Sequence, residues 1–212
     1  MFNDMTFDEL NRLNDTQKSV DYEEFFGGMD ISEDSRDERI DIANRLEEAF
    51  VFVMALMFTM QQYESVDWNR VEEEFRNAYT QVLVEDGNYD DYMEQHVQQF
   101  SQEVTESTRR NQTDPYYYTS DRAKFMAENE SNVTTSHAEY ANAVESGMTQ
   151  KQWIDIRDNR ERETHLEVGR QIIPIDEPFQ VGNSLMMYAR DTQTYSAEPK
   201  EYINCRCTTR YF

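Results

Sequence analysis

Cysteine is scarce in this sequence: two of the 212 residues are cysteines, Cys205 and Cys207. Two cysteines cannot build the disulfide framework on which small secreted proteins depend. A disulfide between them is itself disfavoured, because along an extended strand their Cα atoms lie near the upper limit for a disulfide and their Cβ vectors run parallel. The first residues also lack the basic segment of a secretory signal, with Asp4, Asp8 and Glu9 in its place. We therefore expect synthesis in a reducing compartment.

Positive charge is also scarce, and unevenly so. The formal net charge is −23; residues 1–150 hold 33 acidic and 11 basic side chains, whereas residues 151–212 hold 10 and 9. An acidic protein is repelled by nucleic acid at long range, so that any contact with DNA would need a local patch. The acidic part is compatible with a basic partner surface or with a simple need for solubility.

No apolar run is long enough to span a bilayer. The most apolar one, AFVFVMALMFTM at 49–60, falls well short of the ~20 residues that a transmembrane helix needs. Phe50, Val53 and Met57 recur in it at helical spacing, which predicts a helix buried on most of its faces. Two alternatives remain open: these three residues form a surface for docking or self-association, or the helix is membrane-active. We expect no stable membrane span.

Motifs of common catalytic sites are missing. The sequence has no phosphate-binding loop, no serine nucleophile elbow and no supported pair of carboxylates. In the segment DNRERETH, His165 could act as a general base, Arg160 could steady an anion and Asp158 could orient the histidine. That set would suit a nuclease or toxin-like enzyme, although arginine and aspartate in one short turn more often form a structural ion pair. We expect a protein without enzymatic activity and keep the nuclease as the alternative.

Helical signals dominate the acidic region 1–112. Capping boxes at 6–9 (TFDE) and 35–38 (SRDE) predict two helix starts, the second opening a long helix. A third helix fits 67–87, with an aspartate to start it and a glycine to end it. A fourth helix is predicted over 89–109, from its apolar stripe.

Three stretches predict interruptions or boundaries. The paired glycines of FFGGMD at 25–30 favour a loop. The loop-like composition of 111–121 marks a plausible domain boundary. A helix should follow from Ser120 toward Ser146, with a break in the poor helix former ENESNVTTS at 128–136.

After residue 147 the pattern changes to short strands with one or two helical turns. KQWIDIRD at 151–158 and EYINCRCTTRYF at 201–212 read as strands, and RQIIPI at 170–175 reads as a short extended run. The sequence therefore predicts an α+β protein: a helical N-terminal half, then a small α+β domain over 113–212 with a short antiparallel sheet.

The cysteines have a geometric meaning if the last segment is a strand. Cys205 and Cys207 then point to one face and Arg206 to the other, where it could pair with an acidic group. Two thiolates on one face can bind a metal ion, and two thiols can fill a core. His165 is the nearest third ligand, and Asp158 or Glu163 could supply an oxygen. Zinc binding and thiols packed against a hydrogen-bonded histidine therefore remain two interpretations.

The order of the C-terminal motifs resembles the C-terminal domain of phage minor head proteins of the phage Mu F-like head morphogenesis family. The resemblance covers about residues 120–212, and the closing N-C-R-C is its most specific piece. Ala189 and Arg190 stand where the family usually has Pro-Gly. The matching positions are Trp153, Asp158, Arg160, His165, Gly169, Phe179, Asn204, Cys205, Arg206 and Cys207.

The resemblance also implies a zinc site with missing ligands. Some members of the family carry C-x-x-C where RETH stands here, and a histidine three residues before the first cysteine of N-C-R-C. In this chain Arg162 and His165 occupy the positions of those two cysteines, and Tyr202 occupies that of the histidine. Three ligands therefore remain, His165, Cys205 and Cys207, and a nearby carboxylate would have to complete them.

What the resemblance implies about function is a structural role in a tailed double-stranded DNA phage. Such proteins are minor components of the virion that associate with the portal protein or the inner face of the major capsid protein during head morphogenesis. Some accompany the packaged DNA into the host. The expected location is the capsid interior near the portal, with the host cytoplasm as the place of assembly.

Overall fold

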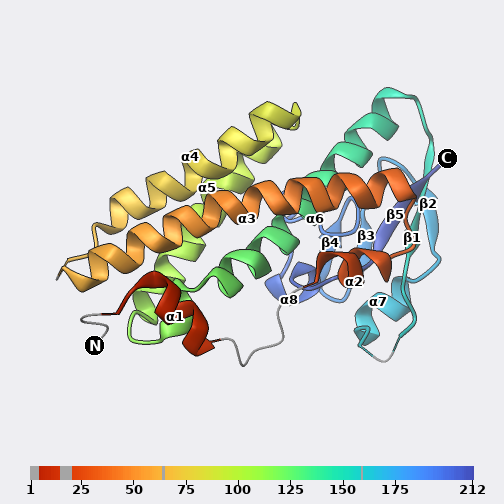
Figure 1. The fold of residues 1–212 in the computed structure, drawn as a ribbon. Coiled ribbons are helices and arrows are strands. Elements are labelled where there is room, and N and C mark those ends of the chain that lie inside the picture. Colours follow the sequence, from red (N-terminus) through yellow and green to blue (C-terminus); the bar gives the residue numbers. More distant parts are fainter. Residues whose placement is uncertain (1–4, 15–20, 64, 159) are drawn as a thin grey trace. The chain divides into compact units, whose positions relative to one another are not determined.

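The computed structural model describes residues 5–14, 21–63, 65–158 and 160–212 (Figure 1). The helices are α1 Phe7–Asn14, α2 Tyr22–Gly27, α3 Glu33–Gln62, α4 Trp68–Asp86, α5 Asp91–Arg110, α6 Ser120–Glu145, α7 Glu163–Val168 and α8 Pro199–Tyr202, with a 3₁₀ turn at Pro115–Tyr118. The strands are β1 Gln150–Ile154, β2 Ile172–Pro174, β3 Phe179–Val181, β4 Ser184–Met186 and β5 Thr208–Tyr211. The predicted α+β class, with helices first and a short antiparallel sheet after them, is confirmed.

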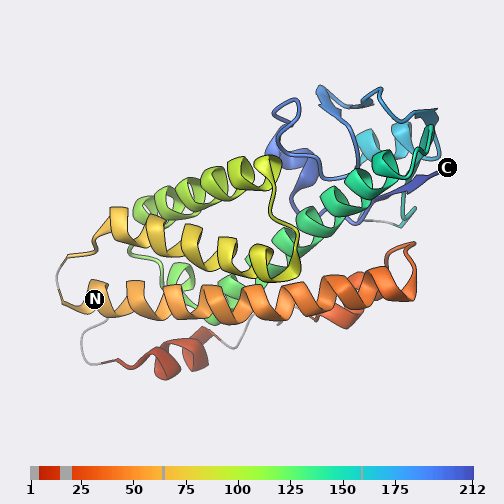
Figure 2. The same ribbon diagram turned by 90° about the horizontal axis from the view of Figure 1, so that it is seen from above.

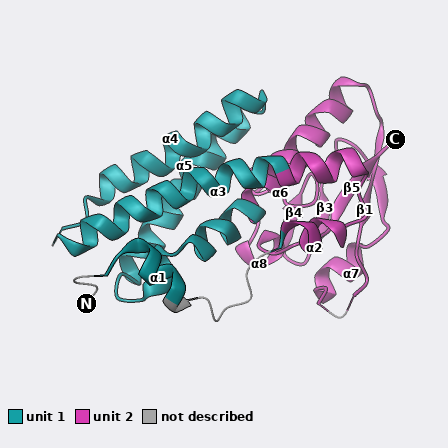
Figure 3. Ribbon diagram, viewed as in Figure 1, with its two compact units in different colours: residues 1–21, 41–128 teal, residues 22–40, 129–212 magenta. Residues whose placement is uncertain are grey.

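The chain divides into two compact units, each built from two segments (Figure 3). Unit 1 consists of residues 1–21 and 41–128, and unit 2 of residues 22–40 and 129–212. Helices α3 and α6 each contribute residues to both units. The regions 1–112 and 113–212 remain a division made on the sequence alone.

In unit 1, α4 and α5 form a helical hairpin and lie side by side in both views (Figure 1, Figure 2). The Asp67 side chain accepts a hydrogen bond from the Arg70 amide at 3.2 Å and starts α4. Gly87 ends it with a φ of 74°, a left-handed conformation that glycine adopts without strain. Asp90 then starts α5 by accepting from the Met93 amide at 2.9 Å. These helix limits follow from local sequence, as predicted.

The core of unit 1 is a cluster of aromatic rings around Phe50 of α3. Its ring centroid lies 5.2–5.8 Å from those of Phe75, Tyr79 and Phe100. Val53 and Met57 are buried with Phe50, so the three residues that the alternative hypothesis assigned to a docking surface are core residues of this unit. Phe52, on the opposite side of the same run, is 66% exposed. Among the described residues, no helix has a stretch long and apolar enough to cross a membrane.

Unit 2 is built on a three-stranded antiparallel sheet in the order β2-β1-β5 and a β3–β4 hairpin. In the register, Lys151 of β1 lies opposite Ile173 and Tyr211, and Trp153 lies opposite Thr209. Side chains from the strands, from α7 and from the connecting segments form the apolar cluster of the unit: Trp153, Val168, Phe179, Val181, Met186, Ala189, Ala197, Cys205 and Cys207.

The predicted break in α6 is wrong, since the helix is continuous from Ser120 to Glu145. The residues at 128–136 are poor helix formers, but all of them are buried. Their polar groups are hydrogen-bonded: Arg39 Nε donates to Asn132 Oδ1 at 2.9 Å, and Thr135 Oγ1 donates to the Ser131 carbonyl at 3.0 Å. Tertiary contacts thus outweigh a weak intrinsic propensity.

Two predictions at the start of unit 2 need correction. The segment FFGGMD was expected to be a loop, and only its second half is one: α2 continues through Gly27, because burying Phe26 against Phe25 and Tyr22 stabilises the helix, and a turn follows from Gly28. The capping box at Ser35 does not form. Ser32 Oγ accepts from the Ser35 amide at 3.1 Å, so that α3 begins at Glu33.

The final segment is a strand only in its second half. Residues 199–202 form α8, and Asn204 has a φ of 56°, which turns the chain before β5 begins at Thr208. Cys205 and Cys207 therefore do not lie on a strand. Both cysteine side chains are buried, whereas Arg206 between them is partly exposed.

Candidate metal centre

His165, Cys205 and Cys207 come together in unit 2. Cys205 Sγ lies 3.5 Å and Cys207 Sγ 3.4 Å from His165 Nδ1, and the possible ligand atoms of the three residues all lie within 4.8 Å of one another. Among the residues that the structure describes, no other group of three or more histidine, cysteine or carboxylate side chains is close enough to share an ion. All three side chains are buried.

The imidazole of His165 is oriented from behind by a carboxylate. His165 Nε2 lies 3.2 Å from Glu201 Oε2, which also accepts from Thr164 Oγ1 at 2.8 Å. When Nε2 carries the proton and donates it to Glu201, Nδ1 presents its lone pair to the two sulfur atoms. Second-shell carboxylates orient metal-binding histidines in the same way.

The pKa values of all three residues of the cluster are shifted from their ordinary values. A hydrogen bond from Cys207, together with those of His165, holds the pKa of Cys205 well below its usual value despite burial. The same contact with Cys205, together with burial, raises the pKa of Cys207. Burial lowers the pKa of His165, but the hydrogen bond and charge of Cys205 outweigh it and raise that pKa. The centre therefore favours the thiolate form of Cys205 next to the positively charged form of His165.

This donor set fits a soft or borderline metal ion. Two cysteine sulfurs and one imidazole nitrogen are preferred ligands of Zn²⁺ in structural sites, which are usually four-coordinate. The set supplies three of the four ligands. The histidine orientation and the stabilised thiolate both suit ligation of a cation.

Asp158 and Arg160, predicted beside this centre, are paired with each other and not with His165. Asp158 forms an ion pair with Arg206, and it accepts from the Arg160 amide at 2.9 Å. The hydrogen bond from Arg206 lowers the pKa of Asp158. As predicted, Arg206 is paired with an acidic group. In the described residues, no hydrogen bond or ion pair joins His165 to Asp158 or Arg160, so the constellation imagined for a nuclease is not assembled by direct contacts.

Asn204 explains why the closing motif needs its first residue. Its left-handed conformation suits asparagine, and its amide donates to Asn129 Oδ1 at 2.9 Å. Asn129 also accepts from Arg190 Nη2, whose other nitrogen Nη1 donates to the Cys205 carbonyl at 2.5 Å. Arg190 itself has a φ of 71°. Where relatives usually have Pro-Gly, this chain thus holds the cysteine segment through an arginine side chain.

The remaining motif residues support the centre from the core. Trp153 and His165 have ring centroids 5.7 Å apart, and Trp153 packs on Phe179 at 5.3 Å. A side chain at Gly169 would lie 2.7 Å from the carboxylate of Asp155, so glycine is required where the chain leaves α7.

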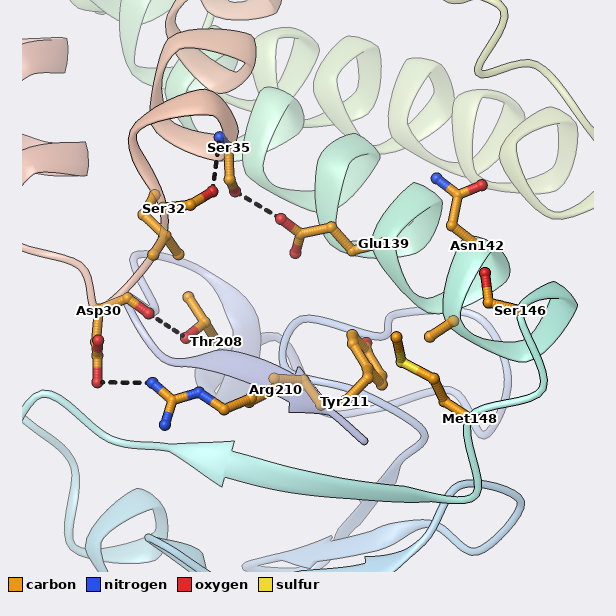
Figure 4. Close-up of a pocket in the computed structure, with 13 residues that line it drawn as sticks. Asp30, Ser32, Ser35, Glu139, Asn142, Ser146, Met148, Thr208, Arg210 and Tyr211 are labelled. Atoms are coloured by element: carbon orange, nitrogen blue, oxygen red, sulfur yellow. Dashed lines mark hydrogen bonds and ion pairs between the residues drawn. The ribbon is translucent and has the colours of Figure 1, made fainter.

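Away from this centre, a hollow of unit 2 lies beside β5 and has a volume of about 600 Å³ (Figure 4). Its charged side chains already have partners: Asp30 pairs with Arg210 at 3.6 Å, and Glu139 accepts from Ser35 Oγ at 2.6 Å (Figure 4). Arg39, fully buried, forms an ion pair with Glu139 at 3.0 Å. The hollow therefore presents mainly neutralised groups, and nothing in it points to one class of ligand.

Sequence reasoning missed the residues that orient the centre. Glu201, Asn129 and Arg190 act on His165 or on the cysteine segment from 15 to 75 residues away in sequence. No spacing rule connects them to the motif. The proximity of Glu201 to Cys205 in the sequence is the single local signal, and it is not specific.

Comparison with known protein families identifies the family of this chain. The family model described as "Phage Mu protein F like protein" matches residues 73–210. The chain belongs to this family. No curated protein and no solved structure shows a significant match to it. Membership places the chain among phage head proteins, and the matched range extends N-terminally beyond the resemblance seen at 120–212, into α4 and α5.

Proposed function

We propose that this protein is a minor head protein of a tailed double-stranded DNA phage. The observation that carries the proposal is the family match over residues 73–210. In this role the protein associates with the portal protein or the inner capsid surface during head assembly in the host cytoplasm, and it remains in the virion near the portal.

The charge distribution is compatible with this role. A protein with a net charge of −23 does not adhere to packaged DNA through long-range attraction. It can therefore stay at its protein partner while the head fills, and it can leave with the DNA at ejection.

Co-sedimentation tests the proposal directly. The full chain is expected to sediment with procapsids that contain portal and to be lost from procapsids assembled without it. Mass spectrometry of purified virions should detect it in few copies. Its absence from both particles would contradict the proposal.

We also propose that the centre of His165, Cys205 and Cys207 binds one Zn²⁺ as a structural ion. The support is the meeting of three suitable ligand atoms and the stabilised thiolate. When bound, the ion would tie the turn before β5 to α7. Elemental analysis of untagged protein should give one zinc per chain, and a Cys205→Ser/Cys207→Ser variant should give none. A well-folded wild-type protein without zinc would leave the thiols as core packing.

A further inference from the structure

Glu161 is the carboxylate that approaches the sulfur side of the centre. Its Oε1 lies 3.5 Å from Cys207 Sγ, and its Oε2 accepts from the Arg157 amide at 2.6 Å. That second contact holds the side chain in place at the end of the loop before α7. The first contact places an oxygen atom next to one of the three donors described above.

The other carboxylates of the neighbourhood are less suitable. Asp158 is paired with Arg206, and Glu163 is exposed. Glu201 accepts from His165 Nε2, on the edge of the imidazole opposite to the one that faces the sulfurs. Glu161 is thus the carboxylate whose free oxygen already contacts a cysteine of the centre.

A small cavity opens where these groups meet. It measures about 20 Å³, which is room for about one water-sized particle. Glu161, His165, Cys205 and Cys207 all line it. The space is therefore of the size that a single ion needs, and its lining residues include one carboxylate, one imidazole and two thiols.

The charges around the cavity also favour a carboxylate as the last ligand. Two thiolates, one carboxylate and a neutral imidazole around Zn²⁺ carry a net charge of about −1. Three arginines line the same cavity: Arg160, Arg162 and Arg206. Each already donates elsewhere or pairs with Asp158, so their charges can offset the site without occupying it.

We propose that Glu161 Oε1 is the fourth ligand of one Zn²⁺ held by His165 Nδ1, Cys205 Sγ and Cys207 Sγ. The inference rests on the proposed zinc site and adds the residue that closes it. Glu161 stands next to the position at which relatives carry the first cysteine of C-x-x-C, so a neighbouring residue takes over a ligand that this chain has lost.

The test is metal binding by the reduced full chain and its Glu161→Gln variant. Zn²⁺ affinity is measured by competition with a chromophoric chelator, and coordination by the visible and near-ultraviolet spectrum of Co²⁺ bound in place of zinc. The variant is expected to bind Zn²⁺ on the order of 100-fold more weakly than wild type. Its Co²⁺ spectrum should lose the intense visible bands of a tetrahedral site and keep the thiolate charge-transfer bands.

Two variants sharpen the result. Glu163→Gln removes an exposed carboxylate two residues away and should bind zinc as wild type does. Glu161→Cys should keep tight binding and increase the thiolate-to-cobalt absorption, because a third sulfur replaces the oxygen. Circular dichroism checks that each variant is folded.

The outcomes separate the two proposals. If the wild-type chain binds no Zn²⁺ or Co²⁺, both the zinc site and the role of Glu161 are overturned. If wild type binds one ion through the cysteines and Glu161→Gln binds it equally well with an unchanged spectrum, the zinc site stands and Glu161 is not its ligand.

Discussion

The two compact units stabilise their interiors by different chemistry. Unit 1 buries aromatic rings around Phe50, at centroid distances of 5.2–5.8 Å. Among the described residues, unit 2 buries more charged side chains than unit 1: Arg39, Lys151, Arg190 and Glu201 are among those of unit 2, whereas Arg122 and Glu128 are those of unit 1. The hydrophobic effect is non-directional, whereas buried polar groups are stable only with specific hydrogen-bond partners. We infer that unit 2 is the more demanding of the two in its sequence, which agrees with the concentration of family motifs in it.

The first and largest test of this comparison removes the last ten residues. A chain that ends at Tyr202 loses β5 and both cysteines. Strand β1 then loses one of its two partners, and Arg190 loses the Cys205 carbonyl. We expect unit 2 to unfold, so that limited proteolysis cuts rapidly within residues 129–202.

The Cys205→Ser/Cys207→Ser variant of the full chain separates the loss of the thiols from the loss of the strand. It keeps β5 and should be more resistant than the truncated chain. A truncated protein that yields an intact, resistant C-terminal fragment would show that the polar interior of unit 2 does not depend on this segment.

The second test concerns the apolar core of unit 1. Phe50→Ala should lower the free energy of unfolding by about 3–5 kcal/mol, because it leaves a cavity between α3, α4 and α5. Phe52→Ala changes the same residue type in the same helix at an exposed position, and its effect should stay within about 0.5 kcal/mol. Urea denaturation measures both. Equal effects of the two substitutions would mean that the ring cluster is not the core.

The same two phenylalanines show what sequence can and cannot give. Helical spacing predicted that 49–60 is a largely buried helix, and that reading is confirmed. The spacing could not decide whether Phe50 lies in the core or on a docking surface. That depends on contacts with Phe75 and Phe100, which come from other helices, and no local pattern encodes how those helices pack. Helix ends such as Asp67 and Gly87 were predictable because their partners are three or four residues away.

The polar interior marks the limit of that approach. Continuity of α6 depends on Asn132, whose partner Arg39 is 93 residues away. The meeting of His165 with the two cysteines was expected from the order of the motifs. Glu201 and Glu161 could be identified only from the folded structure, because a hydrogen bond between residues far apart in the chain produces no recognisable spacing in the sequence.

The third test measures this polar contact. Asn132→Ala removes the acceptor of Arg39 Nε and the donor to the Cys205 carbonyl at 3.4 Å. Leaving a buried guanidinium nitrogen without its partner should cost about 1–3 kcal/mol. Asn142→Ala lies on the same helix at an exposed position and should be neutral or slightly stabilising, since alanine is the better helix former. Denaturant titration gives the free energy of unfolding of the two variants. An unchanged value for Asn132→Ala would mean that the interior of unit 2 tolerates the loss of a hydrogen-bond partner, contrary to the comparison.

The fourth and smallest test uses pH. Lys151 is fully buried, with Nζ donating to the Ile175 carbonyl at 2.8 Å and lying 5.3–5.4 Å from the ring centroids of Phe179 and Tyr140. Burial lowers its pKa from 10.5 to about 8. Below pH 8 the lysine is charged in both states and the folded state bears the desolvation cost.

Between pH 8 and 10.5 the folded protein releases this proton while the unfolded chain keeps it. The unfolded state then binds more protons, so the contribution of Lys151 to the free energy of unfolding rises with pH. Lys151→Met should lose this rise, and the difference in free energy of unfolding between wild type and variant should change by on the order of 1 kcal/mol from pH 8 to pH 10.

Lys200→Met is the control. The hydrogen bond from Lys200 to Glu198 raises the pKa of that exposed lysine, so any pH dependence that it contributes to the free energy of unfolding has the opposite sign. Parallel pH profiles of wild type and Lys151→Met would mean that the buried ammonium costs nothing, and that the polar interior of unit 2 solvates charge better than its burial implies.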